Sequence, residues 1–236
     1  MYCDTTRLAP DIPVPVLRIT SQSKNPGMAK NVERNIKRLH KACDLITNEN
    51  WRNVVKTRYM HDKTNQAFFR VDTDHHIPRI NVRRIPLRKY DIVAISDYNK
   101  GFLTEEDIAY ICAQHPCVFV DTKKPVGRFL KDASFIKINR FEYERSQAIP
   151  RDIARNIICT KGGDPVEFRN KHYPVATVEV KDPCGAGDSF FAGLIVHYAR
   201  GGEIEEAIRF ANVCATHVVQ HKGVSVIPKK VDLTYA

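Results

Sequence analysis

A short turn that combines two glycines with a carboxylate is the part of the sequence best suited to chemistry. Gly185, Ala186, Gly187 and Asp188 follow a strand-like stretch at residues 175–180 and directly precede an apolar segment expected to be helical. Backbone N–H groups at the start of a helix bind anions, and glycines let an anion approach the backbone closely. The helix dipole adds roughly half a positive charge at the same point. The turn therefore predicts a site that stabilises negative charge.

Asp188 is the candidate base of this site. A carboxylate beside an anion site can accept the proton of an attacking hydroxyl, a role worth on the order of 10²–10⁴-fold in rate. A bare Gly-x-Gly-Asp sequence is also compatible with an ordinary strand-to-helix turn that has no ligand. The elements around the turn must decide between these two interpretations.

Alternating apolar runs and amphipathic segments predict an α/β fold with a mainly parallel central sheet flanked by helices. Strands are expected at residues 90–97, 117–121, 134–139 and 156–160, and a helix is expected to begin after Thr104. Ligands bind at the carboxyl ends of parallel strands, so the polar residues there should line one edge of a cleft. These residues are Asp97, Asp121, Asn139 and Thr160.

The amino-terminal third has a different pattern. Residues 14–19, 54–60 and 66–72 are β-like and predict a small accessory sheet, and residues 28–42 predict an amphipathic helix. Near the carboxyl terminus, two buried helices are expected, one from Gly187 to about residue 200 and the other over residues 203–221.

The composition is that of a globular protein, with 43% apolar and 27% charged residues. We find no apolar run long enough to span a bilayer and no export signal, and the seven scattered cysteines lack metal-ligand spacing. A reducing cytoplasm is therefore expected. The net charge of +10 fits phosphorylated ligands, membranes or nucleic acid, but no basic cluster is interleaved with stacking aromatics, so we rank nucleic acid last.

The stretch Asp-Pro-Cys-Gly-Ala-Gly-Asp-Ser-Phe at residues 182–190 resembles the carboxyl-terminal signature of the ribokinase-like, or PfkB, carbohydrate kinases. In that family the glycines form an anion hole and the last aspartate is the base. The resemblance implies ATP-dependent phosphoryl transfer to a sugar hydroxyl. It also implies one ribokinase-like sandwich domain over residues 1–236, with an accessory β-sheet lid from about 13–20 and 54–73 and a possible homodimer through that sheet.

Four further segments narrow the resemblance. Residues 7–16, 26–32, 96–101 and 120–123 are similar to the kinase domain of the bacterial heptose 7-phosphate kinases, which make heptose 1,7-bisphosphate. The partner implied is a small sugar or sugar phosphate, and the cofactors implied are ATP and Mg²⁺. A basic side chain such as Lys123 or Lys161 near the phosphates would neutralise charge on the transferring group.

The resemblance assigns further residues to the two substrates. Those implied to bind the nucleotide are Asn139, Glu142, Thr160, Lys161, Gly162, Asn212, Lys222 and Gly223. Those implied to bind the sugar are Gly27, Asn31, Asp97, Lys123 and Asp182. Asn139 and Glu142 form the family's Asn-x-x-Glu element, which is expected to organise Mg²⁺ indirectly.

The chain departs from the family on the sugar side. The family's first strand, which supplies an acidic sugar-binding residue, lies before the position of Arg7, and Met28 replaces a glycine that lets the sugar approach the backbone. The His-x-Gly-His element needed for nucleotidyl transfer is absent from the sequence. An alternative is therefore a degenerate member of the family that binds nucleotide or sugar phosphate without turnover.

Overall fold

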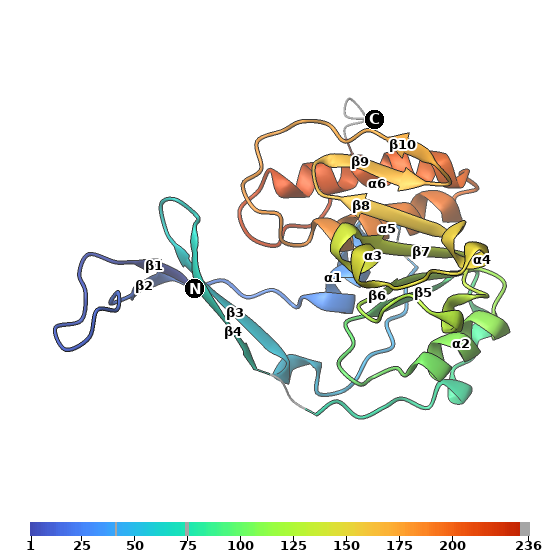
Figure 1. Cartoon of the computed structure of the whole chain (residues 1–236), viewed down its shortest axis with the longest axis horizontal. Coiled ribbons are helices and arrows are strands. Elements are labelled where there is room, and N and C mark those ends of the chain that lie inside the picture. The colour runs from blue at the N-terminus through green and yellow to red at the C-terminus, as the bar shows by residue number, and fades with distance from the viewer. Residues whose placement is uncertain (41, 74–75, 232–236) are drawn as a thin grey trace. The chain divides into compact units, whose positions relative to one another are not determined.

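A computed structural model describes residues 1–40, 42–73 and 76–231, which divide into two compact units (Figure 1). Unit 1 comprises Met1–Pro26 and Glu49–His76, and unit 2 comprises Gly27–Asn48 and Ile77–Ala236. Position 41 of the helix predicted over residues 28–42 lies outside the described residues. So do residues 74–75 and 232–236 of the predicted 1–236 domain.

Unit 2 contains a six-stranded sheet in the order β10-β9-β8-β7-β6-β5 (Figure 1). Its strands are β5 (Val93–Asp97), β6 (Val118–Thr122), β7 (Phe135–Asn139), β8 (Ile157–Lys161), β9 (Asp164–Phe168) and β10 (Lys171–Tyr173). Strands β5 to β8 run parallel, whereas β9 is antiparallel to β8 and β10 is antiparallel to β9. The predicted α/β class and the four predicted parallel strands are confirmed.

The helices also follow the sequence pattern closely. The α-helices are α1 (Met28–Leu39), α2 (Glu105–Gln114), α3 (Arg140–Arg145), α4 (Arg151–Ala154), α5 (Ala186–Ala199) and α6 (Ile204–Val219). Short 3₁₀ helices are η1 (Trp51–Asn53), η2 (Val82–Arg84), η3 (Leu87–Lys89) and η4 (Arg128–Leu130). Thr104 caps α2 as predicted, because its hydroxyl accepts from the Asp107 N–H while the Asp107 carboxylate accepts from the Thr104 N–H.

Two hydrophobic cores lie on opposite faces of the sheet. On one face, Phe119 and Ile158 of the sheet pack with apolar residues of α1, α5 and α6. On the other face, Val120 and Ile136 pack with apolar residues of α2 and of the loops beside it. Strand β6 is buried along its whole length, which is how a parallel strand covered on both faces behaves.

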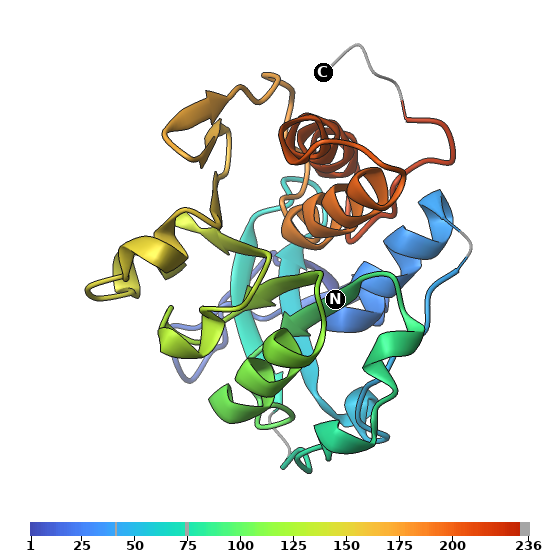
Figure 2. The same ribbon diagram turned by 90° about the vertical axis from the view of Figure 1, so that its right-hand side faces the viewer.

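Helices α5 and α6, drawn in orange to red, lie side by side in Figure 2. Their close approach depends on Gly193, since a Cβ atom at this position would lie 2.8 Å from Cys214 Sγ and 3.2 Å from the Ala211 Cα. Cβ atoms essentially never come within 3.0 Å of a neighbouring heavy atom, so the 2.8 Å contact with the sulfur could not persist without a shift. A larger residue at position 193 would therefore force the two helices apart.

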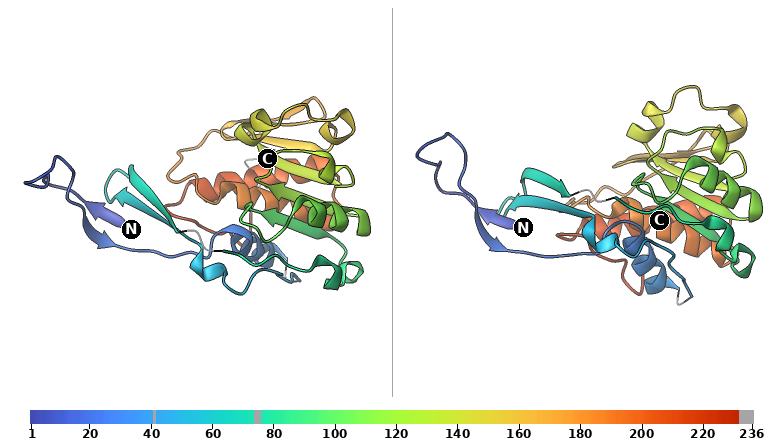
Figure 3. Two further views of the ribbon diagram at one scale, coloured as in Figure 1. Left: turned by 60° about the horizontal axis from the view of Figure 1, so that its bottom comes forward. Right: turned by 90° about the horizontal axis from the view of Figure 1, so that it is seen from below.

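Unit 1 contains a four-stranded sheet in the order β2-β1-β3-β4. Its strands are β1 (Tyr2–Asp4), β2 (Arg18–Ser21), β3 (Val55–His61) and β4 (Ala67–Thr73). The predicted hairpin β3–β4, drawn in teal in Figure 3, is confirmed. The strand predicted over residues 14–19 begins later, at Arg18, because the run contains Pro15, which has no N–H to donate to a neighbouring strand.

Two further predictions of strand position were wrong or incomplete. Residues 175–180 form no strand, and the chain there is fastened by a side chain, since Asn212 Nδ2 donates to the Pro174 carbonyl at 3.0 Å. The hairpin of β9 and β10 was not predicted. Its turn is formed by Arg169 and Asn170, which have φ +48° and +61°, and it lacks the glycine that marks many tight hairpin turns in a sequence.

Among the described residues, no helix is both long enough and apolar enough to cross a membrane.

We expect Gly193→Ala to destabilise the protein by about 1–2 kcal/mol, because overpacking between α5 and α6 outweighs the helix-propensity gain of about 1 kcal/mol. The matched control is Gly163→Ala, where an added Cβ meets no atom within 4 Å, so its stability should stay within about 0.5 kcal/mol of wild type. Urea unfolding measures both. Equal stability of the two variants would contradict the packing constraint.

Candidate active site

The turn that carries the two glycines begins α5 and leaves backbone donors free. Gly185 has φ +88°, in the left-handed region that favours glycine, and its carbonyl accepts from the Ser189 N–H. Among the described residues, no acceptor is present for the N–H groups of Gly187 and Asp188. Two unpaired donors at the positive end of a helix dipole form a site for an anion.

Asp188 stands at this turn with both carboxylate oxygens held. Oδ2 accepts from Asn31 Nδ2 at 2.7 Å, and Oδ1 accepts from the Tyr98 hydroxyl at 2.7 Å. Burial raises the pKa of the Asp188 carboxyl, while the hydrogen bonds from Asn31 and Tyr98 lower it and the charge of Asp121 raises it. The net effect is a raised pKa, which makes Asp188 a stronger base than an exposed aspartate.

A cluster of charged side chains lies beside Asp188, at the carboxyl ends of β6 and β7. Lys137 Nζ donates to Asp121 Oδ2 at 2.8 Å, and Lys123 forms an ion pair with Glu142. Asp121 Oδ1 is buried and makes no hydrogen bond with the described residues. The site therefore combines fixed cations with carboxylates in a buried setting, where charge interactions are strengthened.

The Asn-x-x-Glu element forms a capping box at the start of α3. Asn139 Oδ1 accepts from the Glu142 N–H at 2.9 Å, and Glu142 Oε2 accepts from the Asn139 N–H at 2.9 Å. Glu142 is buried, although it is a charged residue. This reciprocal pair fixes the Glu142 carboxylate next to Lys123.

The same residues suit an indirect role toward Mg²⁺. This ion prefers oxygen ligands, retains several waters and is commonly bound through one or two carboxylates together with substrate phosphates. Glu142 already uses both oxygens within the protein, whereas Asp121 Oδ1 is a buried carboxylate oxygen without a hydrogen-bond donor. The donor set fits a hydrated ion held partly by the nucleotide.

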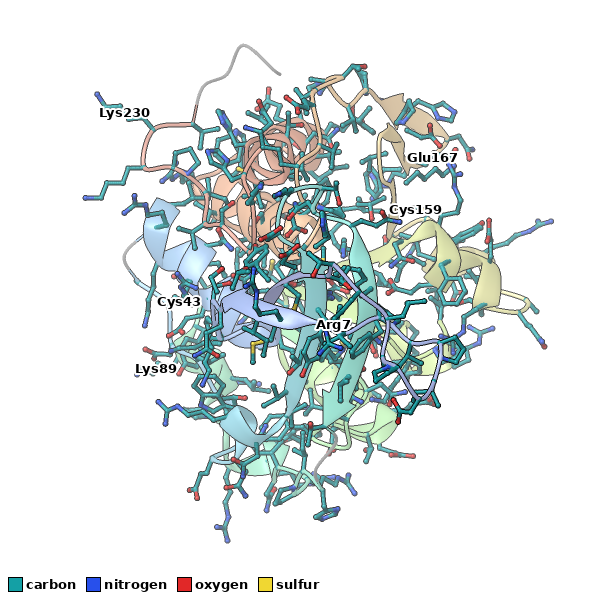
Figure 4. All side chains as sticks on the ribbon, turned by 90° about the vertical axis from the view of Figure 1, so that its left-hand side faces the viewer. Arg7, Cys43, Lys89, Cys159, Glu167 and Lys230 are labelled. Atoms are coloured by element: carbon teal, nitrogen blue, oxygen red, sulfur yellow. The ribbon has the colours of Figure 1, made fainter. Side chains whose placement is uncertain are left out.

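Other residues predicted to bind the nucleotide lie at neighbouring positions. Thr160 is the Cα partner of Asn139 across β7 and β8, and its hydroxyl donates to the Ile138 carbonyl. Lys161, at the end of β8, forms an ion pair with Glu167 of β9, which is labelled in Figure 4. Gly162 follows with φ +66° and begins the turn into β9.

Asp182 links the glycine turn to the segment predicted beside the adenine. Its Oδ1 accepts from the Cys184 N–H at 2.8 Å, and its Oδ2 accepts from the Gly223 N–H at 3.1 Å. Lys222 is exposed beside it. Asn212 is buried on α6, and its side-chain amide holds the carbonyls at the start of residues 174–180.

Asp97 makes contacts that are internal to the strand ends. Its Oδ2 accepts from Thr122 Oγ1 and from Lys124 Nζ, each at 2.7 Å, and its Oδ1 accepts from the Asn99 N–H at 2.9 Å. Because Asp97 is buried with this carboxylate fully engaged, the structure uses it to fix the ends of β5 and β6. The neighbouring Tyr98, rather than Asp97, contacts Asp188.

Two residues of the site, Tyr98 and Lys137, were not among the predicted site residues, whereas Asp121 was predicted at the strand ends that line the cleft. Signals for both missed residues were present in the sequence. Lys137 is a lysine inside an otherwise apolar strand, two positions before Asn139 and therefore on the same side of β7. Tyr98 directly follows a predicted strand end, where ligand-binding residues gather.

The start of α1 carries Asn31 into the site. The Asn31 N–H donates to the Gly27 carbonyl at 3.0 Å, and Gly27 has φ +61°. Met28, which stands where the family has a glycine, has φ +47°. Residues with a side chain are strained at a positive φ. Met28 nevertheless has the backbone conformation that glycine favours.

The comparisons with known proteins agree with this fold and site. Residues 87–230 match the pfkB family of carbohydrate kinases. Solved structures that share the fold include ribokinase from Thermotoga maritima, with a TM-score of 0.68, 17% identity, and 96% of this chain and 93% of that chain covered. Phosphofructokinase-2 from Escherichia coli has a TM-score of 0.66 and 16% identity, with 97% of this chain and 93% of that chain covered.

The ribokinase-like fold and the glycine turn thus define the class, a carbohydrate kinase. The chain belongs to the pfkB carbohydrate kinase family, a family of phosphotransferases. It is 29% identical over 274 residues to the bifunctional protein HldE of Helicobacter pylori (strain Shi470), covering 92% of this chain. It is 26% identical over 287 residues to HldE of Nitrobacter hamburgensis, covering 96% of this chain. The chain spans 59% of the length of each of these relatives.

We expect Met28→Gly to be more stable than Met28→Ala by about 1 kcal/mol, because only alanine is strained at a positive φ. Both variants lose the methionine side chain, so their difference isolates the backbone effect. In an ordinary helix interior the order is reversed by about the same amount. Thermal or urea unfolding of the pair measures the difference, and a more stable alanine variant would refute the strain.

Proposed function

We propose that the chain catalyses ATP-dependent phosphoryl transfer to a hydroxyl of a sugar or sugar phosphate. The observation that carries the proposal is the position of the Asp188 carboxylate. It is held by Asn31 and Tyr98 at a helix start where the N–H groups of Gly187 and Asp188 have no acceptor among the described residues. A base and an anion site at one point are what transfer from ATP to an alcohol requires.

Each part of the turn has a role in this proposal. Asp188 accepts the proton of the attacking hydroxyl, and its raised pKa brings its basicity closer to the working pH. The N–H groups of Gly187 and Asp188 stabilise the charge that develops on the transferring group. Gly185, with its positive φ, and Ala186 shape the turn that presents these donors.

The nucleotide and the metal ion would be held at the neighbouring strand ends. Bound Mg²⁺ neutralises charge on the phosphates. Asn139 and Glu142 would orient that ion through water, and Lys161 would leave its pairing with Glu167 to meet the phosphates. The remaining residues proposed to contact the nucleotide are Thr160, Gly162, Asn212, Lys222 and Gly223.

Heptose 7-phosphate is the first acceptor to test, with heptose 1,7-bisphosphate as the product. The proposal is supported by the resemblance of four sequence segments to heptose 7-phosphate kinases and by the similarity to the HldE proteins. The sugar-binding residues proposed are Gly27, Asn31, Lys123 and Asp182, whereas Asp97 would act by holding the strand ends. Nucleotidyl transfer is not part of this proposal, because the chain lacks the His-x-Gly-His element.

A second candidate function is binding of nucleotide or sugar phosphate without turnover. Met28 favours it, because a side chain stands where a glycine would let the sugar approach the backbone, and the backbone retains the positive φ that glycine favours. Calorimetry that detects ATP binding, together with an absence of turnover on phosphorylated sugars, would support this candidate over the kinase.

We expect Asp188→Asn to lower kcat by on the order of 10²–10⁴-fold, because the amide cannot accept the proton. Folding should not suffer. Burial raises the pKa of the Asp188 carboxyl, so its ionised form is disfavoured in the folded state. The wild-type protein therefore loses folding stability as the pH rises through that pKa. An asparagine side chain does not ionise, so the Asp188→Asn variant does not have this loss. A Tm at pH 8 at or above that of wild type checks this.

The matched control for this test is Asp132→Asn, an exposed aspartate near Lys131, which should keep the wild-type kcat. ADP release measured over a panel of phosphorylated sugars gives the rates. Equal turnover by wild type and Asp188→Asn would contradict the role of Asp188. In wild type, activity should fall on the acid side at a pH above the usual aspartate range, because protonated Asp188 cannot act as a base.

We also propose that unit 1 serves as the accessory lid of the kinase and as a homodimer contact. Large apolar side chains are exposed on the sheet of this unit and on the loop before β2, and exposed apolar patches commonly mark contact surfaces. They are Leu8, Ile12, Val14, Ile19, Val55, Phe69 and Val71. Pairing of two copies through such a sheet would remove these side chains from water.

We expect the protein to elute as a dimer and Val71→Lys to weaken that dimer, because the variant places a charge on the apolar sheet. Val71 is 46% exposed, and Val180 of unit 2 is 58% exposed, so Val180→Lys is a matched control that should leave the dimer intact. Size-exclusion chromatography with light scattering measures the mass. A monomeric wild-type protein, or dimers in both variants, would refute the contact.

The cytoplasm is the proposed location. All seven cysteines are free of disulfide bonds in the structure, and four of them are buried. Free cysteines are typical of proteins in a reducing compartment.

A further inference from the structure

Lys137 is a buried cation that the mechanism above leaves without a role. It lies in β7, in the middle of the sequence Phe-Ile-Lys-Ile-Asn, and is only 4% exposed. Burial by itself lowers the pKa of its ammonium, but the charge and hydrogen bond of Asp121, with the charges of Glu142 and Asp188, raise that pKa further. Lys137 is therefore a fixed positive charge at the working pH.

The position of Lys137 places this charge against the glycine turn. A Cβ atom added to Gly187 would lie 3.1 Å from Lys137 Nζ, so the ammonium lies directly beside the Gly187 backbone. The N–H group of Gly187 is itself without an acceptor in the described part of the chain. Because position 187 has no side chain, no side-chain atom of this residue stands between Lys137 Nζ and the anion site.

The hydrogen bonds of Lys137 are incomplete. An ammonium has three N–H donors, and among the described residues the only acceptor for Nζ is Asp121 Oδ2, at 2.8 Å. Unpaired donors of a buried charge are costly, because they have lost water without gaining a partner. A purely structural contact would also be served by apolar side chains of similar volume. The unfilled donors thus call for a further acceptor.

We propose that Lys137 is a catalytic residue that binds the transferring phosphoryl group. Its Nζ donates to a non-bridging oxygen of that group, together with the N–H groups of Gly187 and Asp188, while Asp121 holds the ammonium in place. The inference rests on the proposed kinase function, and it gives the buried ammonium of Lys137 in β7 a role in that reaction.

The step balances with Lys137 protonated throughout. The sugar hydroxyl gives its proton to Asp188, and its oxygen forms a bond to the γ-phosphorus of ATP. The bond between the γ-phosphorus and the oxygen that bridges it to the β-phosphorus breaks, and ADP leaves with that electron pair. Lys137 neutralises charge on the oxygens of the phosphoryl group as it moves, and it neither gains nor loses a proton.

This role predicts a difference between two nucleotides. ATP has the γ-phosphate that Lys137 contacts, and ADP lacks it. Removing the ammonium should therefore weaken binding of ATP while leaving binding of ADP unchanged. A structural role would weaken both nucleotides or neither, because loosening the strand ends affects the whole site.

The test is titration calorimetry of the full chain with Mg²⁺-ATP and with Mg²⁺-ADP. For Lys137→Met we expect ATP to bind at least about tenfold more weakly and ADP to bind within about twofold of wild type, with kcat lowered by about 10²–10³-fold. The matched control is Lys131→Met, an exposed lysine near Asp132, which should change neither nucleotide. Equal loss of both nucleotides, or loss of neither, overturns the proposal.

A second variant covers the chance that Lys137→Met strands the buried Asp121 charge and unfolds the chain. The double variant Lys137→Met with Asp121→Asn removes both charges, and we expect it to fold and to lose at least about tenfold more affinity for ATP than for ADP, because loss of the Asp121 oxygen toward Mg²⁺ affects both nucleotides alike. If this neutral pair binds ATP as tightly as wild type, the proposal is wrong.

The two proposals fail in different ways. If Lys137→Met weakens binding of ATP but not of ADP, and wild type turns over no sugar, the kinase function is overturned and Lys137 remains a contact of the γ-phosphate. Turnover that depends on Asp188 but is normal in Lys137→Met would overturn only the role of Lys137. A wild-type protein that does not bind ATP would overturn both.

Discussion

The site depends on the hydrogen bonds that hold the Asp188 carboxylate. Asn31 of α1 and Tyr98, which follows β5, are 157 and 90 residues from Asp188 in the sequence, and each bond is 2.7 Å long. These two contacts join three elements at the start of α5. Without these hydrogen bonds, the partly buried carboxylate would lose its contacts with water and gain no donors in return, which is energetically costly. The same two hydrogen bonds therefore fix the positions of the elements and prepare the base.

Much of the architecture followed from local sequence, but the charge cluster did not. The strands ending at Asp97 and Asn139 were predictable, because apolar runs closed by polar residues report burial directly. The turn at Gly185 was predictable because glycine readily adopts the positive φ that a tight turn before a helix requires. Lys137 was missed, although it stands out as a lysine in an apolar strand, because its role depends on Asp121, its partner on the adjacent strand β6, and local sequence does not show which residues pair across strands.

The missed hairpin and the misplaced strand have one physical explanation. Residues 175–180 have the composition of a strand, but they pair with no strand of the described sheet, whose edge on this side is formed by β9 and β10. Asn212 holds the segment by its side chain instead. Strand propensity expresses a fit to a neighbouring strand, and a sequence alone does not reveal whether that neighbour exists.

The contact between Gly193 and Cys214 has a consequence for which substitutions this helix pair can accept. Burial raises the pKa of the Cys214 thiol to about 12, so this cysteine is inert and its value lies in its size. Since the sulfur fills the space that a side chain at position 193 would need, position 193 is not free to enlarge while Cys214 keeps its sulfur. A larger residue at position 193 therefore requires a second substitution, to a smaller residue at position 214, together with a shift of the α6 backbone.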